Sequence, residues 1–178
     1  MRFHPTDLAD AVLIEIEKRG DERGFFARTF CEEEFAQAGL VTRFVPANAS
    51  ASRKAGTLRG LHYQVAPHAE TKVIRCTRGA IFDVIVDLRP DSPSYRRWQG
   101  FELTAAEGTM LYIPEGFAHG YQTLADDTEV AYQVSAPYAP GAEAGIRYDD
   151  PAFGITWPMP VTAISEKDVS WPDFVAER

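Results

Sequence analysis

Short segments in which apolar and polar residues alternate dominate the chain. In VLIEIE (12–17) apolar and acidic residues alternate, as in a strand with one buried face. Turn residues separate many such segments, which is typical of a sandwich or barrel, and the Gly and Pro punctuation fits a jelly roll. The pattern therefore predicts an all-β fold of about ten strands, over 12–17, 23–30, 43–50, 57–64, 71–77, 80–89, 98–105, 109–114, 117–124 and 129–136.

One segment is predicted to be helical. CEEEFAQAG (31–39) places acidic residues in its first turn and Gly39 at a C-cap position. In the strand predicted over 43–50, Pro46 indicates an edge strand or a bulge. The tail from Tyr138 onward is rich in Pro, Gly and Asp, which predicts loops and short helices.

The segment AIFDVIVDLR (80–89) places an acid on an apolar face. Strict alternation puts Asp83, Ile85 and Asp87 on the face opposite Phe82 and Val84. An aspartate on a mostly apolar face needs a partner. Before this segment, the dipeptide at 78–79, Arg-Gly, predicts a tight turn after the strand at 71–77.

Length and composition are those of an ordinary globular domain. The chain has 178 residues, of which 45% are hydrophobic and 25% charged, and we expect one domain over 1–178. The longest early apolar run, AVLI at 11–14, is too short for a signal peptide or a membrane span. Cys31 and Cys76 form no CxxC motif and suggest no disulfide framework. We therefore expect a cytoplasmic protein with no membrane partner.

Charge argues against nucleic acid as a partner. The formal net charge is −8, and no cluster of Lys and Arg interrupts it. Nucleic-acid binding needs a basic stripe or patch. A small anionic ligand remains compatible with the sequence, because a few local arginines are enough to bind it.

The segment TLRGLHYQ (57–64) carries Arg59 and one of the four histidines, His62, on a predicted core strand. Further on, Gly108, Pro114, Gly116 and His119 have a spacing that resembles the second cupin motif.

In metal-binding cupins His119 would be a ligand, together with an HxH pair and a glutamate on an earlier strand. Here that strand has His62-Tyr63-Gln64, and Lys72 falls close to the glutamate position, with Glu70 nearby. A lysine repels a divalent cation, so the metal-site interpretation is disfavoured, although a metal-dependent cupin isomerase or oxygenase stays open as an alternative.

Several motifs together resemble one family. TLRGLHYQ, FDVIVDLR, IPEGFAHGY, VAYQVS, YDDPAFGITWP and ISEKD occur in the order and spacing of the dTDP-4-dehydrorhamnose 3,5-epimerase family. The resemblance runs from DERGFF at 21–26 to ISEKD at 164–168. It implies a cupin-type jelly roll, a homodimer, no cofactor and no metal. It also implies a nucleotide-diphosphate 4-keto-6-deoxyhexose as substrate, epimerised at C3 and C5 through an enolate.

The resemblance also implies catalytic roles. His62 would be the base, since an imidazole can accept a proton near neutral pH. Asp168 would orient His62, and Tyr132 would return a proton from the opposite face. Lys72 and His119 would hold the C4 oxygen, with Lys72 supplying the charge that a metal supplies in related cupins. Asp83 would then be the partner of His119.

The remaining implied residues bind substrate. Arg23 and Arg59 would grip the diphosphate, for which a planar guanidinium is suited. Tyr138 would stack on the nucleobase. The resemblance gives further contacts at five positions, namely Phe26, Arg28, Asn48, Glu143 and Lys167.

The sequence departs from the family at the nucleotide end. Arg28 stands where the family has an acid, and Pro46-Ala47-Asn48 stands for Gln-Asp-Asn. Since an arginine can donate two hydrogen bonds to guanine, a GDP- or CDP-linked sugar is an alternative to the dTDP-sugar. The sequence is also compatible with an epimerase acting at C3 or C5 alone, and with a non-catalytic sugar-binding cupin.

The spacing of Arg59 and His62 raises a geometric question. Residues three apart on a regular strand face opposite ways. If both line one cavity, a bulge at Gly60 would bring them to the same side.

Overall fold

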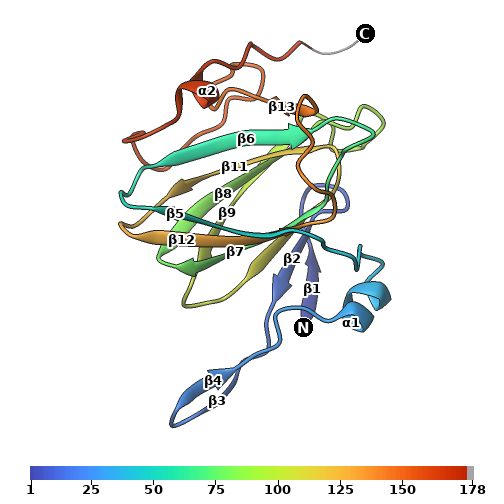
Figure 1. Cartoon of the computed structure of the whole chain (residues 1–178), viewed down its shortest axis with the longest axis vertical. Helices are drawn as coiled ribbons and strands as arrows, with labels where there is room; N and C mark the ends of the chain where they lie inside the picture. Colours follow the sequence, from blue (N-terminus) through green and yellow to red (C-terminus); the bar gives the residue numbers. More distant parts are fainter. Residues whose placement is uncertain (176–178) are drawn as a thin grey trace.

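The computed structural model describes residues 1–175 and confirms the predicted all-β fold. Its strands form a six-stranded sheet in the order β1-β2-β10-β7-β12-β5, a five-stranded sheet in the order β13-β6-β11-β8-β9, and the hairpin β3-β4 (Figure 1). All the sheet pairs are antiparallel.

The strands span β1 Arg2–Pro5, β2 Val12–Glu15, β3 Arg19–Asp21, β4 Gly24–Phe26, β5 Ala47–Ser52, β6 Leu58–Gln64, β7 Lys72–Arg78, β8 Ala80–Asp87, β9 Trp98–Thr104, β10 Met110–Ile113, β11 Phe117–Thr123, β12 Thr128–Val134 and β13 Glu143–Gly145. The helices are α1 Glu32–Gln37 and α2 Glu166–Val169.

The two large sheets pack against each other through one apolar cluster. Ile74 and Leu111 come from the six-stranded sheet, and Ile81 and Ile85 from the five-stranded sheet. On β8, Val84 joins a different cluster on the outer face of its sheet, so the predicted alternation along this strand is confirmed. Burial of such side chains contributes roughly 1.5–3 kcal/mol each.

The outer faces of the two sheets are covered by different parts of the chain. Phe35 of α1 is fully buried and packs with Ile14 and Met110 on the six-stranded sheet. Phe153 and Phe174, from the C-terminal segment, cover the five-stranded sheet. The C-terminal segment therefore lies over the sheet that contains β6 (Figure 1).

Several predicted boundaries differ from the observed ones. Within 23–30 only Gly24–Phe26 is strand, and it pairs with β3 as a hairpin. The strand predicted from 43 begins at Ala47, after Pro46, and β5 is an edge strand as that proline indicated. The turn at 78–79 joins β7 and β8, which belong to different sheets, so it is a corner of the barrel and not a hairpin turn.

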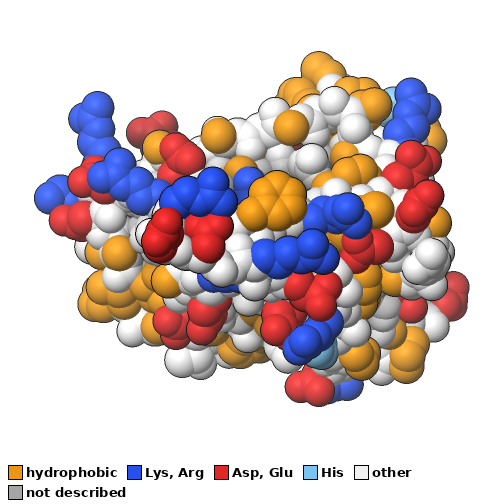
Figure 2. Space-filling model, turned by 90° about the horizontal axis from the view of Figure 1, so that it is seen from below, with side chains coloured by type: hydrophobic (Ala, Val, Ile, Leu, Met, Phe, Trp, Pro, Cys, Tyr) orange, Lys and Arg blue, Asp and Glu red, His pale blue; other side chains and the backbone are white. Residues whose placement is uncertain are grey.

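The β3-β4 hairpin projects away from the two sheets (Figure 1). On β4 of this hairpin Phe25 and Phe26 are exposed, with 59% and 73% of their surface accessible. On the lower face of the molecule, Figure 2 shows positive and negative side chains interleaved without one continuous basic area. Within residues 1–175, neither helix has the length or the apolar composition that a membrane crossing would require.

Candidate functional site

A pocket of about 640 Å³ opens between the two large sheets. Strands β5, β7 and β12 line one wall, β6, β11 and β13 line the other, and the segment around α2 closes one side. Ten of the predicted site residues line it, namely Asn48, Arg59, His62, Lys72, His119, Tyr132, Tyr138, Glu143, Lys167 and Asp168.

His62 and Asp168 form a short hydrogen-bonded pair. His62 Nε2 lies 2.6 Å from Asp168 Oδ1, and the backbone N–H of Gly60 donates to Oδ2 at 3.2 Å. Burial opposes ionisation of Asp168, but the hydrogen bonds from His62 and Gly60 outweigh it and lower the pKa of the carboxyl. Because an ionised carboxylate only accepts, Nε2 carries the hydrogen and Nδ1 is the basic atom of His62.

Gly60 explains how Arg59 and His62 come to line the same cavity. The pairing of β11 with β6 shifts register between His119 and Tyr121, opposite this part of β6. Gly60 has φ +117°, and a Cβ there would lie 2.5 Å from Gly120 Cα. The predicted irregularity at Gly60 is therefore confirmed, and only a glycine fits it.

Tyr132 lies on the wall that faces His62. It belongs to β12 of the six-stranded sheet, whereas His62 belongs to β6 of the five-stranded sheet. Burial, together with the nearby charge of Glu70, raises the pKa of Tyr132, although Arg59 opposes the shift. A raised pKa keeps the phenol protonated at neutral pH, so Tyr132 can donate a proton.

Lys72 brings a nearly buried positive charge into the pocket. Its Nζ lies 2.9 Å from Glu70 Oε1 and donates to the His62 carbonyl at 3.3 Å. Glu70 also accepts a hydrogen bond from Gln64 Nε2 at 3.0 Å. Lys72 therefore has a neutralising partner and is held against the strand that carries His62.

Asp83 stands behind the pocket wall and contacts it through His119. His119 Nε2 lies 2.9 Å from Asp83 Oδ2, which confirms the partner expected for this inward aspartate. Burial of the fully enclosed side chain raises the pKa of Asp83, although His119 and Lys72 oppose it. Among residues 1–175, Asp83 Oδ1 has no hydrogen-bond partner.

Arg59 lies in the pocket without a carboxylate partner among the described residues. Its guanidinium donates to Ser52 Oγ and to the Ala51 carbonyl, both at 3.2 Å. Because neither acceptor is charged, the positive charge of Arg59 remains available to an anionic ligand.

Charged and aromatic residues form the rim of the pocket. Lys167 Nζ lies 2.5 Å from Glu143 Oε2, and Tyr138 Oη donates to the same oxygen at 3.1 Å. Burial acts to raise the pKa of Glu143, but these hydrogen bonds outweigh it, and the pKa is lowered. Tyr138 itself is 64% exposed, so its aromatic ring is accessible to a ligand.

Besides Asp83, which stands behind the wall, three predicted substrate-binding residues lie outside this pocket. Arg23 is in the projecting hairpin region and binds Asp21, at 2.6 Å, with 85% of its side chain exposed. Phe26 ends β4, and Arg28 binds Glu34 of α1 at 2.7 Å. The fold of one chain therefore does not bring these residues to His62.

Sequence reasoning missed other residues of the pocket. Tyr121 lines it and donates to Ser50 Oγ at 3.1 Å. Alternation along β11 places Tyr121 on the same face as His119, and this signal could have identified it. Gln64 and Glu70, also in the lining, were weighed only against the metal-ligand pattern, in which Gln64 stands in place of a histidine. Across residues 1–175, no three His, Cys, Asp or Glu side chains converge in a way that could bind a metal ion.

The paired sheets and the pocket between them define a cupin-type barrel. The family model for dTDP-4-dehydrorhamnose 3,5-epimerase matches residues 5–176. The chain therefore belongs to the dTDP-4-dehydrorhamnose 3,5-epimerase family, whose members are isomerases.

Individual relatives agree with this assignment. The Sinorhizobium fredii dTDP-4-dehydrorhamnose 3,5-epimerase is 46% identical over 175 residues, which cover 98% of this chain and 90% of that protein. The Bacillus anthracis dTDP-4-dehydrorhamnose 3,5-epimerase, solved with TDP and diphosphate bound, is 40% identical with a TM-score of 0.94, covering 97% of this chain and 99% of its own. The Legionella pneumophila dTDP-6-deoxy-D-glucose-3,5-epimerase, solved in complex with dTDP-4-keto-L-rhamnose, is 36% identical with a TM-score of 0.89. The match covers 96% of this chain and 90% of the Legionella chain.

Proposed function

We propose that this chain epimerises a nucleotide-linked 4-keto-6-deoxyhexose at C3 and C5, converting dTDP-4-dehydro-6-deoxy-D-glucose to dTDP-4-dehydro-L-rhamnose. The observation that best supports this reaction is the placement of His62 and Tyr132 on facing sheets of one pocket. Inversion of a carbon requires a proton to leave from one face and another to arrive on the opposite face. A base and a protonated phenol on opposing walls meet this requirement.

In the proposed mechanism His62 Nδ1 removes the proton from the carbon next to the C4 ketone. The electron pair of the broken C–H bond moves into an enolate whose negative oxygen Lys72 and His119 stabilise. Asp168 holds the resulting imidazolium by its hydrogen bond to Nε2. Tyr132 donates its phenolic proton to the other face of the same carbon. Before the second inversion the imidazolium releases its proton to solvent and the Tyr132 phenolate takes one up from solvent. The same steps at the second carbon then complete the reaction.

The nucleotide diphosphate would bind toward Arg59 and the rim. The unpaired charge of Arg59 suits a diphosphate oxygen, and the exposed ring of Tyr138 suits stacking on a base. Asn48, Glu143 and Lys167 supply polar contacts along the same lining.

The position of Arg28 favours dTDP over a guanine nucleotide. Its guanidinium forms an ion pair with Glu34 of the same chain at 2.7 Å, so it is not free to read guanine. Competition binding of dTDP and GDP tests this choice. We expect dTDP to bind at least about tenfold more tightly, a difference of about 1.4 kcal/mol; equal binding or a preference for GDP would contradict it.

A homodimer is part of the same proposal. Arg23 and Phe26 belong to a hairpin that projects from its own chain with exposed aromatic side chains. A second copy would give this hairpin a surface to cover and could bring both residues to the partner's pocket. The test mixes two inactive variants, His62→Gln and Arg23→Ala combined with Phe26→Ala. Recovery of activity in the mixture supports a shared site, and no recovery between folded variants that exchange subunits contradicts it.

Proton exchange tests the reaction itself. The enzyme would be incubated with dTDP-4-dehydro-6-deoxyglucose in deuterium oxide, and C3 and C5 followed by NMR and mass spectrometry. Deuterium at both carbons with formation of the rhamnose configuration is the expected result. Deuterium at only one carbon would identify a single-centre epimerase. No exchange by folded protein that binds dTDP would support the non-catalytic sugar-binding alternative.

A further inference from the structure

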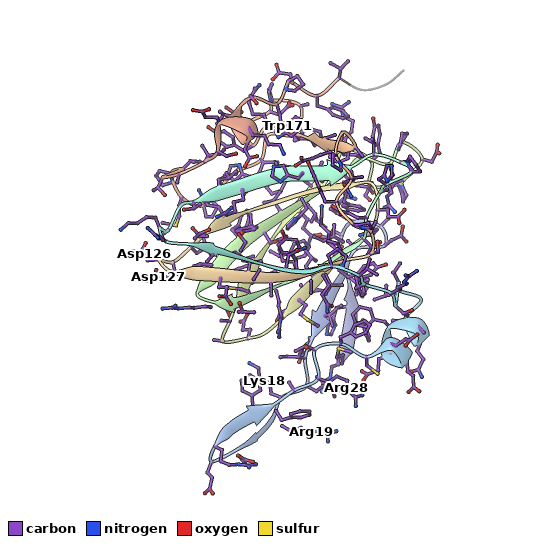
Figure 3. All side chains as sticks on the ribbon, viewed as in Figure 1. Lys18, Arg19, Arg28, Asp126, Asp127 and Trp171 are labelled. Atoms are coloured by element: carbon purple, nitrogen blue, oxygen red, sulfur yellow. The ribbon has the colours of Figure 1, made fainter. Side chains whose placement is uncertain are left out.

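Trp171 lies beside the proposed base but takes no part in the proton transfers proposed above. Its indole packs edge-on against the imidazole of His62, with ring centroids 6.5 Å apart and ring planes at 65°. The residue follows α2 by two positions, and Figure 3 labels it above β6, next to α2 and β13. The same short segment therefore supplies both Asp168 and an aromatic neighbour to His62.

Gly145 provides the space that the indole occupies. It is the cross-strand partner of His62 in the pairing of β13 with β6. A Cβ atom at Gly145 would lie 2.3 Å from Trp171 Cε2 and 2.4 Å from Nε1, far inside van der Waals contact. The indole thus fills the position that a side chain opposite His62 would otherwise take.

The segment that carries Trp171 is fixed at several points. Lys167 Nζ lies 5.8 Å from the indole centroid, within the range of a cation–π contact. Arg147 donates to the Trp171 carbonyl at 3.5 Å and forms an ion pair with Asp173 at 2.7 Å. These contacts, made to the ring, to the Trp171 carbonyl and to Asp173 two residues later, hold the indole beside the imidazole.

The indole N–H does not account for the choice of this residue. Trp171 Nε1 is buried, and within residues 1–175 it has no hydrogen-bond partner. An unsatisfied buried N–H costs about 1–3 kcal/mol. The useful property of Trp171 is therefore its flat apolar surface, which a phenylalanine would supply in part.

We propose that Trp171 is a positioning residue for His62. Its ring restricts rotation of the imidazole, so that Nε2 stays on Asp168 and Nδ1 faces the pocket. Gly145 is required because it leaves room for that ring. The placement of the imidazole is a property of the free protein, whereas its effect on turnover rests on the epimerase function proposed above.

Nitrogen NMR of the histidine rings tests the placement without any substrate. The His62 signals would be assigned by their loss in His62→Gln, and their shifts report which ring nitrogen carries the hydrogen. We expect the shifts of the two His62 ring nitrogens to move toward a common average in Trp171→Ala. In Trp171→Phe they should keep the native pattern. Trp171→Leu, which retains apolar volume, replaces the alanine variant if that one does not fold, with the same expectation. An unchanged His62 pattern in the folded Ala or Leu variant would overturn the proposal.

A matched control separates positioning from general loss of packing. Trp157 donates to the Tyr148 carbonyl at 2.9 Å and packs on Phe82, away from the pocket lining. Trp157→Ala should reduce thermal stability but leave the His62 signals in place. Movement of those signals to the same extent as in Trp171→Ala would also overturn the proposal.

Turnover and a double-mutant cycle give the second readout. Trp171→Ala should lower kcat about tenfold or more with little change in KM, and Trp171→Phe should restore most of it. Gly145→Ala should lower kcat in the native protein but not in the Trp171→Ala background, where its methyl group has room. Additive effects of the two substitutions would overturn the proposal. If the native protein does not turn over the dTDP-sugar, the proposed function fails, and the NMR result still decides the role of Trp171.

Discussion

Lys72 of the six-stranded sheet donates a hydrogen bond to the backbone carbonyl of His62 on the five-stranded sheet, with 3.3 Å between Nζ and the oxygen. The contact joins the two walls of the pocket at the residue proposed as base. A positive charge is thereby fixed beside the place where an enolate would form. The side chain of Lys72 is only 10% exposed, so water screens this charge little.

Lys72→Met tests this electrostatic role. We expect kcat to fall by about 10²–10³-fold, since comparable losses follow removal of one oxyanion-stabilising group. Binding of dTDP should change little, because Lys72 is assigned to the sugar oxygen. Steady-state kinetics and calorimetric titration with dTDP measure the two effects. Lys54→Met, an exposed lysine outside the pocket, serves as control. Equal kcat values in the two variants would contradict the role.

Asp168 should make stability depend on pH in the acid range. The folded-state pKa is lowered, so this carboxylate stabilises the fold above its unfolded pKa of about 3.9. That contribution disappears as pH falls through the folded pKa. The melting temperature of the native protein should therefore fall more steeply below about pH 4 than that of Asp168→Asn. If the melting temperatures of the two proteins fall equally with pH, the neighbours of Asp168 do not lower its pKa.

Asp83 should behave in the opposite sense. Its pKa is raised, so the folded protein retains a proton that the unfolded chain loses above about pH 3.9. Stability is then lost as pH rises from that value through the folded pKa. Asp83→Asn cannot titrate, so its melting temperature relative to native should increase with pH across this window.

Activity provides a second measurement for Asp83. Asp83→Asn keeps the size of the side chain but weakens the hydrogen bond that orients His119. We expect a more stable protein with kcat reduced about tenfold. A variant that is both less stable and fully active would contradict the assignment of Asp83 as the residue that orients His119.

The alternation of apolar and polar residues predicted the features that are set by residues close together in the sequence. The alternation in 80–87 correctly placed Asp83 on the inner face of β8, and Gly60 was correctly expected at an irregularity. Long-range pairs could not be predicted in this way. His62 and Asp168 are 106 residues apart, and only the family resemblance joined them before the structure did.

The role inferred for Trp171 depends on Gly145 lying opposite His62, a register that no local signal encodes. The β3-β4 hairpin was partly misjudged for a different reason. A continuous strand was predicted over 23–30, but the chain turns at 22–23 and leaves the pairing after Phe26. Apolar residues in this segment indicate burial, whereas Phe25 and Phe26 are exposed in the single chain.

Gly60→Ala should be strongly destabilising. The new methyl group would meet Gly120 Cα at 2.5 Å and the His119 carbonyl oxygen at 2.8 Å, in a backbone conformation with φ +117°. Strain and overpacking together predict a loss of about 3 kcal/mol or more. Gly141→Ala is the matched control, because Gly141 has φ +87° but no atom within 4 Å of the place that a Cβ would take. Denaturant unfolding measures both, and similar losses would show that positive φ alone matters.

Tyr132→Phe separates proton removal from proton return. His62 and Asp168 are untouched by this change, so the variant should still remove a proton from the sugar and exchange it with solvent. Without the phenol on the opposite sheet, the enolate regains its proton mainly from the side of His62, and the original configuration returns. In deuterium oxide we expect label at C3 or C5 of unreacted substrate, with product formation reduced by about 10²-fold or more.

The contrast with His62→Gln makes the Tyr132 result decisive. That variant should lose exchange and product together, because no base remains on its wall of the pocket. If Tyr132→Phe also loses exchange, Tyr132 takes part in proton removal or in holding the sugar. If it forms product at the native rate, another group returns the proton. Exchange without inversion in Tyr132→Phe, together with neither in His62→Gln, is the outcome that assigns the base to one sheet and the acid to the other.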